Sequence, residues 1–296
     1  MSVFLVNPRY ALHLWRQGLR TATDFLNWSQ GSLVSRHRRR CTTLVNLHGI
    51  SGYLKRQKRI AWKERFAGWW DGFGLVSRAL REWQVLCELQ DDGQLGPDPM
   101  AVGETDAGAF VLVRALPEAV DLPTLLAQRL CPRERREIAG RVGRAAASLH
   151  ERGFSHPDLF AKHVFIHCET GTVRFVDFQR TRRHLQGVPW PQRCRDLAAL
   201  NASLHPNAVS ASERFRLLLA YLEQTEASAP PLVRILERWI GRRTSQLLTR
   251  PKHQRLRLQT VHLGSTSIVI AGQRLRVSPS RFALADTLIT AEPGDA

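Results

Sequence analysis

Residues 156–177 read HPDLFAKHVFIHCETGTVRFVD, a polar loop followed by two short apolar runs. The loop contains His156, Asp158 and His163, and the first apolar run, 164–166, follows it directly. A turn at 169–171 separates this run from the second one, 173–176, which ends at Asp177. Apolar runs joined by a glycine-containing turn are typical of a β-hairpin. We therefore expect a hairpin with a polar loop before its first strand and an aspartate after its second.

A long helix is expected immediately upstream of this hairpin. Residues 133–152 place Ile138, Val142, Ala145 and Leu149 at helical spacing, so that they form one apolar stripe. Gly153 follows at the position where a glycine commonly ends a helix. The loop at 154–163 therefore begins just after a helix.

The N-terminal part of the chain is expected to be rich in β-structure. Short β-prone runs at 33–34 and 42–45 precede a glycine-containing turn at 48–52 and a further strand that contains Lys55. Residues 9–28 and 77–90 have helical spacing, and 108–114 read as a strand. Residues 195–248 are mainly helical in pattern, and three β-prone runs follow at 261–263, 267–270 and 273–277.

This order of elements predicts an α+β fold rather than a doubly wound sheet, in which strands and helices would alternate. A β-rich part comes first, the strand at 108–114 connects it to a helical part, and a small β segment ends the chain.

Composition limits the class of protein. The chain has 296 residues, 43% of them hydrophobic, which excludes a disordered basic tail as a description of the whole. It contains no run of about eighteen uncharged apolar residues that could span a bilayer, and its N-terminus lacks the pattern of a secretory signal. The five cysteines are scattered without a CxxC pair, which favours neither a zinc site nor a disulfide framework. We expect a protein of the reducing cytoplasm.

The net charge of +17 favours a polyanionic partner. Basic residues concentrate at 36–40, 55–59, 180–183 and 250–255. Each cluster alone is equally well explained as a solvated face, whereas four together indicate nucleic acid, anionic lipid or an acidic substrate. No RNA-recognition motif supports nucleic acid.

Four residues occur in an order that carries chemistry. Lys55 ends a strand, Glu82 lies in the following helix, Asp158 lies in the loop, and Asp177 ends the hairpin. Each is unremarkable alone, but this order and this secondary-structure context match the parts of a protein-kinase-like phosphotransferase.

With these motifs in view, the sequence resembles the bacterial lipopolysaccharide kinase family, the Kdo kinases and core heptose kinases, and is most similar to the heptose-kinase branch. The resemblance covers roughly residues 30–222. It rests on the segments YLKR at 53–56, REW at 81–83, HxDxxxxH at 156–163, VDFQR at 176–180 and RDLAAL at 195–200. It implies a bilobal protein-kinase-like fold, with a nucleotide-binding N-lobe at 1–114 and a catalytic C-lobe at 115–250. The β-prone runs after residue 250 add a β-rich extension at 251–296.

The resemblance also implies roles for the four residues, with ATP and Mg²⁺ as cofactors. Lys55 would reach the α- and β-phosphates of ATP, and Glu82 would hold it through an ion pair. Asp177 would ligate Mg²⁺, which prefers carboxylate oxygens. Asp158 would act as the base that accepts or orients the acceptor hydroxyl.

Two further residues would support the loop. His156 would tie it to the Asp177 segment. Asp196 resembles a buried helix aspartate that receives backbone amides of the loop, although an ordinary charge near a helix N-terminus explains it equally well.

Two departures from protein kinases leave roles open. His163 stands where protein kinases have asparagine, and because imidazole matches Mg²⁺ poorly, it would bind metal or a phosphate oxygen, or be purely structural. No glycine-rich loop covers the phosphates, and the matching turn at 35–40 is rich in arginine. Arg38 and Arg39 could neutralise ATP phosphates, face an acidic substrate or lipid headgroup, or be solvated. Phe178-Gln179, in place of Phe-Gly, argues against a flipping activation loop.

By analogy, the acceptor is a sugar hydroxyl, on heptose or Kdo, of the lipopolysaccharide inner core at the cytoplasmic face of the inner membrane. We expect a cytoplasmic protein in peripheral contact with that anionic membrane. Trp62, Trp69 and Trp70 could anchor at the interface or could pack in the core between the lobes.

Two rival functions stay open. The first is a kinase of another acceptor, a small molecule or a protein, and the HxDxxxxH loop and the RDLAAL helix favour lipopolysaccharide over it. The second is an inactive basic scaffold of the same fold. The missing glycine loop supports the scaffold, whereas the presence of Lys55, Glu82, Asp158 and Asp177 argues against it.

Overall fold

The computed structural model describes residues 2–37, 39–90, 95–225 and 230–253, and the backbone of two short strands at 268–270 and 273–275. The chain divides into two compact units that are interleaved in sequence. The first comprises Met1–Leu116, Leu149–Asp158 and Phe175–Arg193, and the second comprises Pro117–Ser148, Leu159–Arg174 and Cys194–Ala296. The continuous domains predicted at 1–114, 115–250 and 251–296 stay a prediction.

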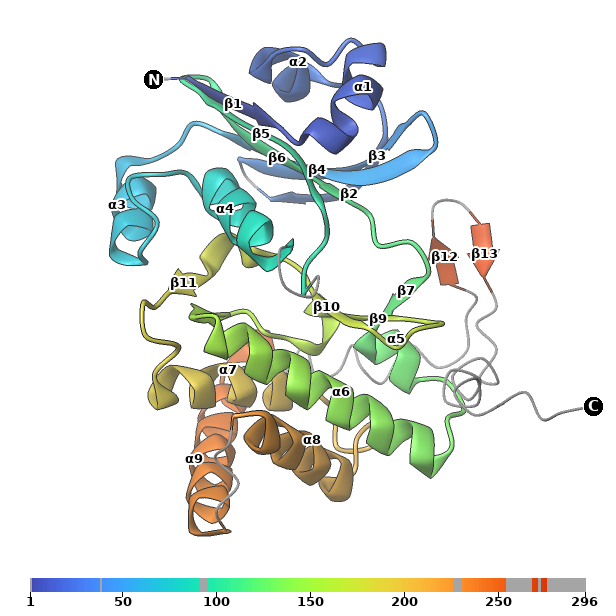
Figure 1. Cartoon of the computed structure of the whole chain (residues 1–296), viewed down its shortest axis with the longest axis vertical. Helices are drawn as coiled ribbons and strands as arrows, with labels where there is room; N and C mark the ends of the chain where they lie inside the picture. The colour runs from blue at the N-terminus through green and yellow to red at the C-terminus, as the bar shows by residue number, and fades with distance from the viewer. Residues whose placement is uncertain are drawn as a thin grey trace, which may run out of the picture. The chain divides into compact units, whose positions relative to one another are not determined.

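The first unit is built on a six-stranded antiparallel sheet (Figure 1). Its strands are arranged in the order β1-β5-β6-β4-β3-β2. Their bounds are β1 Val3–Val6, β2 Ser32–His37, β3 Arg40–Leu47, β4 Ile50–Lys58, β5 Pro99–Thr105 and β6 Gly108–Arg114. The strands predicted at 33–34, 42–45 and 108–114 are therefore present, whereas β1 and β5 were not expected.

The turn between β3 and β4 fixes the register of the strand that carries Lys55. Both turn residues have positive φ, 48° at His48 and 87° at Gly49, as a two-residue hairpin of type I′ requires. The register that follows pairs Thr42 with Lys55, and Lys55 with Val111 of β6. Lys55 thus lies within an interior strand that continues to Lys58, and the expectation that it ends a strand is wrong.

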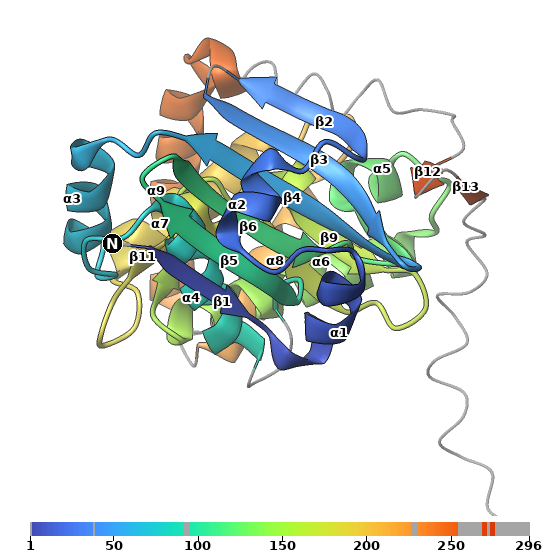
Figure 2. The same ribbon diagram turned by 90° about the horizontal axis from the view of Figure 1, so that it is seen from above.

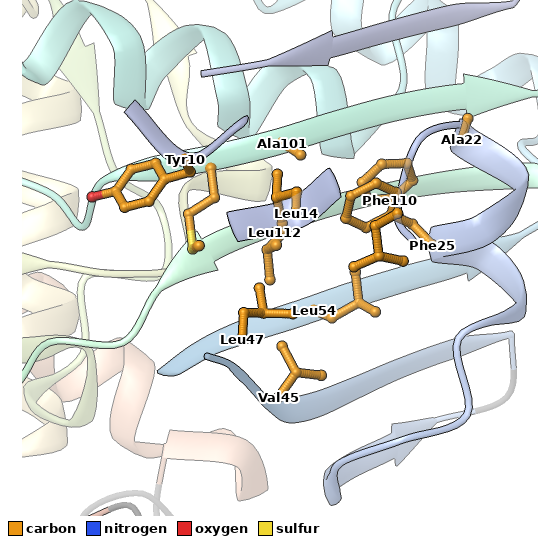
Figure 3. Packing of buried hydrophobic residues seen from close by; sticks show 12 residues of the cluster. Tyr10, Leu14, Ala22, Phe25, Val45, Leu47, Leu54, Ala101, Phe110 and Leu112 are labelled. Atoms are coloured by element: carbon orange, nitrogen blue, oxygen red, sulfur yellow. The ribbon is translucent and has the colours of Figure 1, made fainter. Parts of the chain in front are cut away.

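One face of this sheet packs against α1, Pro8–Arg16, and α2, Ala22–Asn27 (Figure 2). The core between them includes Leu14 and Leu54 (Figure 3), and the rings of Phe25 and Phe110 stack with centroids 4.3 Å apart. The helical pattern at 9–28 corresponds to these two helices, which residues 17–21 separate. Gly18, two residues after the end of α1, has φ +76°, and Thr21 caps the N-terminus of α2 with a capping box.

The other face carries α3, Trp62–Trp70, and α4, Arg78–Gln90 (Figure 1). The helix predicted at 77–90 is confirmed by α4. Trp62, Trp69 and Trp70 on α3 are 69%, 61% and 79% exposed. The interpretation of these tryptophans as core residues is therefore wrong, because their helix presents them to solvent.

The remaining elements of the first unit surround the loop and the aspartate singled out in the sequence. Strands β8, Phe154–Ser155, and β11, Arg182–Arg183, pair antiparallel, and the short 3-10 helix η2 spans Phe178–Arg180. Gly153 has φ +81°, and a Cβ there would lie 2.2 Å from the carbonyl oxygen of His184. Glycine is therefore required where the preceding helix ends, as the sequence predicted.

The second unit is mainly helical and contains a three-stranded sheet in the order β10-β9-β7. The predicted hairpin at 164–166 and 173–176 corresponds to β9 and β10. The bounds are β7 Ala119–Asp121, β9 Val164–His167, β10 Val173–Phe175, α5 Leu122–Leu126, α6 Pro132–Glu151, η1 Ala161–His163, α7 Trp190–Ser203, α8 Ala211–Gln224 and α9 Pro230–Leu248.

The expected C-terminal β segment is described only in part. Strands β12, Ile268–Ile270, and β13, Gln273–Leu275, form an antiparallel pair. The run expected at 261–263 lies outside the described residues. An antiparallel sheet near the N-terminus and helices toward the C-terminus together confirm the α+β class.

Candidate active site

Lys55 reaches the α4 side of the sheet because strand residues alternate between faces. Its neighbours Leu54 and Arg56 point to the opposite face, where Leu54 joins the core and Arg56 donates to the Leu26 carbonyl at 3.2 Å. The Lys55 side chain is 17% exposed. A long cationic side chain is thus held along the sheet with little access to water.

Glu82 meets Lys55 from α4. Lys55 Nζ donates to Glu82 Oε1 at 2.6 Å, and the Glu82 side chain is only 1% exposed. The helix period places Glu82 on the inner side of α4 with Leu86 and Leu89, both fully buried. The ion pair links β4 to α4, as the sequence analysis expected.

Asp177 forms an ion pair with the same ammonium group, and its Oδ1 lies 3.8 Å from Lys55 Nζ. Burial opposes the charge of Lys55, but the carboxylates of Glu82 and Asp177 outweigh it and raise the pKa of Lys55 above its ordinary value. Lys55 is therefore a fixed positive charge at neutral pH. Its only described hydrogen bond goes to Glu82, so two of its three N–H groups can bind an anion.

The backbone at Asp177 is in the left-handed region, with φ 69° and ψ 59°. This conformation is uncommon for residues other than glycine, and when it occurs it concentrates at functional sites. It sets the Asp177 carboxylate at the start of η2 with 41% of the side chain exposed.

The carboxylate of Asp177 fits a Mg²⁺ ligand. Mg²⁺ in phosphotransferases uses one or two carboxylates and completes its shell with water and phosphate oxygens. Across the described residues, no three histidine, cysteine, aspartate or glutamate side chains gather as a metal-binding group.

Asp158 is paired with Arg180, a residue to which the sequence analysis gave no role. Arg180 Nη1 lies 3.1 Å from both carboxylate oxygens of Asp158. The Asp158 side chain is 12% exposed, and that of Arg180 is 55% exposed. The position of Arg180, three residues after Asp177 in the VDFQR segment, was the available sequence signal for this partner.

His156 joins the loop to the segment that carries Asp177. Its Nε2 lies 3.1 Å from the carbonyl oxygen of Val176, and its ring centroid lies 5.2 Å from that of Phe178. The side chain is buried. These contacts connect the residues flanking Asp158 to those flanking Asp177, the arrangement expected of His156.

His163 and Asp196 belong to the second unit. His163 ends η1, where its N–H donates to the Phe160 carbonyl at 2.8 Å and its ring lies 5.7 Å from that of Phe160. Asp196 in α7 is fully buried, and its Oδ1 accepts from Arg195 Nε at 3.0 Å. A metal or phosphate role for His163, and a loop-binding role for Asp196, stay predictions.

The arginine-rich turn lies between β2 and β3. Arg39 is exposed there, and its carbonyl oxygen accepts from the Lys58 N–H at 2.9 Å. Arg38 lies outside the described residues. Because Thr42 pairs with Lys55, the turn is about 10 Å farther along the strands, and binding of phosphate by Arg39 stays a prediction.

A family model now identifies the chain. The model described as the lipopolysaccharide kinase (Kdo/WaaP) family matches residues 30–221, well over half of the sequence. The chain belongs to the lipopolysaccharide kinase family. The resemblance drawn from its motifs is confirmed.

The fold agrees with this membership. A solved structure of WaaP in complex with acyl carrier protein matches with a TM-score of 0.63 and 21% identity, over 83% of this chain and 99% of the other. At this identity the likeness shows the fold, which is that of a WaaP-like kinase. A comparison with curated proteins gave no match. Within the described residues, no helix combines the length and apolar character needed to cross a bilayer.

Proposed function

We propose that this member of the lipopolysaccharide kinase family transfers the γ-phosphate of ATP to a sugar hydroxyl, on heptose or Kdo, of the lipopolysaccharide inner core. The observation that carries the proposal is the convergence of Glu82 and Asp177 on the ammonium of Lys55, whose side chain is 17% exposed. A cation fixed by two carboxylates and left with spare N–H groups is suited to binding a polyphosphate.

Positioning and charge neutralisation dominate phosphoryl transfer, and the first unit supplies groups for both. Lys55 would hold the phosphates of ATP, while Glu82 keeps its side chain in place. Asp177 would hold Mg²⁺ together with phosphate oxygens, and bound Mg²⁺ would neutralise phosphate charge. His156 keeps the loop of Asp158 against the segment of Asp177.

Asp158 would be the base. The acceptor hydroxyl oxygen forms a bond to the γ-phosphorus, the bond to the ADP oxygen breaks, and the hydroxyl proton passes to Asp158. A carboxylate accepts hydrogen bonds at both oxygens, and Arg180 Nη1 contacts both oxygens of Asp158 from one side chain. Arg180 would orient Asp158 and, being half exposed, could also contact an anionic acceptor.

The test is phosphotransfer by purified protein from ATP to a lipid A–core acceptor lacking the phosphate, followed by mass spectrometry of the sugar. Asp158→Asn should lower the rate about 10²- to 10⁴-fold, the usual contribution of a general base, while ATP binding persists. An equal rate in this variant would remove Asp158 from the mechanism. Loss of a core phosphate in a deletion strain would identify the hydroxyl.

The same assay separates the rival functions. Phosphorylation of an aminoglycoside or a protein in preference to the core sugar would support a kinase of another acceptor. ATP binding without transfer to any acceptor would support an inactive scaffold. Nucleic acid is not a favoured partner, and its binding would show a steep dependence on salt concentration.

The proposed acceptor is lipid-linked and anionic, so the proposal includes peripheral contact with an anionic membrane at its cytoplasmic face. The net charge of +17 supports this contact, because each basic residue near an anionic surface contributes about 1 kcal/mol. Binding should therefore weaken as the salt concentration rises.

An acyl carrier protein is a second proposed partner, by extension from the WaaP complex. The second unit contains a cavity of about 280 Å³ with mostly apolar walls, among them Leu122, Ile138, Val142 and Leu218. Such walls suit a fatty acyl chain. Co-purification with acylated but not unacylated carrier protein is expected, and its loss in Val142→Trp would tie binding to this cavity.

A further inference from the structure

Helix α3 carries a continuous aromatic stripe that the proposed chemistry does not use. Trp62, Phe66, Trp69 and Trp70 stand at helix positions i, i+4, i+7 and i+8 and therefore share one side. Their exposed fractions are 69%, 59%, 61% and 79%. Ring centroids lie 6.2 Å apart for Trp62 and Phe66, and 6.4 Å apart for Trp69 and Trp70. Contiguous exposed aromatic surface of this kind marks an interaction site.

The opposite side of α3 is fixed to the elements that build the active site. Glu64 is buried and accepts from Gln57 Nε2 at 2.8 Å and from the Arg78 N–H at 3.3 Å. Gln57 lies two residues after Lys55 on β4, and Arg78 begins the helix that carries Glu82. Glu64 therefore connects α3 to the strand that carries Lys55 and to the helix that carries Glu82.

The C-terminal end of α3 is fixed to the segment that follows Asp177. Asp71 accepts a hydrogen bond from Arg81 Nη1 at 2.9 Å, and it forms an ion pair with Arg182, whose Nε lies 3.0 Å from Asp71 Oδ1. Its carbonyl oxygen accepts from the Arg183 N–H at 2.9 Å, and the Arg183 guanidinium lies 4.6 Å from the centre of the Phe73 ring. A partner that binds the outer side of α3 would therefore have a fixed orientation relative to Lys55, Glu82 and Asp177 of the same unit.

Charge indicates what that object is. Lys58, Arg59 and Lys63 are exposed at the start of α3 and just before it. Indole rings combined with basic side chains are the composition of elements that bind the headgroup region of membranes. Two turns of helix, about 12 Å long, suffice to lie in the plane of that region with one side buried.

We propose that the aromatic stripe of α3 is the surface that binds the headgroup region of an anionic bilayer, and that it presents the active site to a lipid-linked acceptor. The nature of the acceptor rests on the proposed function, whereas the lipid binding itself does not. Bilayer contact would place a site attached to α3 close to the sugars that project from the membrane.

The test is flotation with vesicles of three parts phosphatidylcholine to one part phosphatidylglycerol at physiological salt. The variant Trp69→Ser/Trp70→Ser should bind these vesicles at least about tenfold more weakly, because it lacks two indoles that bilayer binding would bury in the headgroup region. Trp62→Ser/Phe66→Ser gives an independent second pair. The matched control is Trp15→Ser/Trp239→Ser, which removes two tryptophans that are 53% and 49% exposed elsewhere and should leave binding unchanged.

Further arms separate this proposal from its alternatives. Lys58→Gln/Lys63→Gln should weaken binding to the anionic vesicles, and vesicles of phosphatidylcholine alone should bind weakly. Thermal unfolding checks that every variant is folded. Equal vesicle binding by the stripe variants and the wild type, or absence of wild-type binding, would overturn the proposal. So would a wild-type dimer that the stripe variants convert to monomers while vesicle binding is unchanged.

The kinase assay distinguishes failure of this proposal from failure of the proposed function. The stripe variants should phosphorylate a vesicle-embedded acceptor more slowly than the wild type, but a delipidated core oligosaccharide equally fast. Equal rates on the embedded acceptor would count against membrane presentation. If the wild type phosphorylates neither acceptor, the proposed function fails, and flotation still decides whether the stripe binds lipid.

Discussion

Helices α3 and α4 lie on the same face of one sheet and both contain tryptophan, yet the environments of these tryptophans are opposite. Trp83 of α4 is 9% exposed, whereas Trp70 of α3 is 79% exposed. Helix α4 buries most of its length and holds Glu82 away from water, while α3 buries only Glu64 and Gly68. Two neighbouring helices thus differ in role. Helix α4 holds a charged group of the site in place, whereas α3 exposes an aromatic surface to solvent.

The largest expected effect separates the two buried glutamates of these helices. Glu82→Gln should lower phosphotransfer about 10²- to 10³-fold, because Lys55 loses the charge that holds its ammonium toward the phosphates. Glu64→Gln, the matched change on α3, should retain most activity on a delipidated acceptor. Steady-state rates with ATP and a soluble core oligosaccharide measure both. Similar losses in the two variants would erase the functional difference between the helices.

The next largest effect concerns stability. Trp83→Ala should lower the free energy of unfolding by about 3–5 kcal/mol, because a buried indole leaves a cavity. Trp70→Ala should change it by less than about 0.5 kcal/mol, as expected of an exposed side chain. Urea unfolding followed by circular dichroism measures both values. A large loss in Trp70→Ala would mean that the stripe is covered in solution.

An intermediate effect tests how firmly the end of α3 is held. Asp71→Ala should lower the free energy of unfolding by about 3 kcal/mol, because it leaves the Arg81 side chain, which is 4% exposed, without its carboxylate partner. Glu88→Ala on α4 removes an ion pair with Arg183. Because the Glu88 side chain is 48% exposed, this change should lower the free energy of unfolding by less than about 1 kcal/mol. Urea unfolding of the two variants compares them directly. Equal costs would show that Asp71 is not a fixing point of α3.

The smallest effect is expected from pH. The folded pKa of Lys55 is raised above its unfolded value of about 10.4. The stability from its charge is therefore fully present below that unfolded value, and it is lost only as pH rises through the higher folded value. Affinity for ATP should not change through deprotonation of Lys55 between neutral pH and about pH 10. Calorimetric titrations of the wild type and Lys55→Arg should run parallel across this range, and divergence would show that Lys55 titrates earlier.

Local patterns predicted much of the fold, because they depend on neighbouring residues. The glycine after α6, the extent of α4 and the hairpin of β9 and β10 follow from helix caps, periodicity and turn residues. The helical pattern at 9–28 is present, but its division into α1 and α2 at Gly18 and the Thr21 cap was not predicted. Strand β1 was missed because a four-residue strand depends on pairing with β5.

The order of Lys55, Glu82, Asp158 and Asp177 in the sequence was enough to indicate a protein-kinase-like phosphotransferase, because the motif residues follow fixed secondary-structure elements. The resemblance to the lipopolysaccharide kinase family came from the longer motif segments around them. The ion pair of Lys55 with Glu82 was implied by the family resemblance, whereas only the tertiary structure decided that Arg180 meets Asp158 across 22 residues of sequence. It also decided which tryptophans are buried. A tryptophan has the same apolar ring in either setting, and its exposure depends on whether another element packs over it.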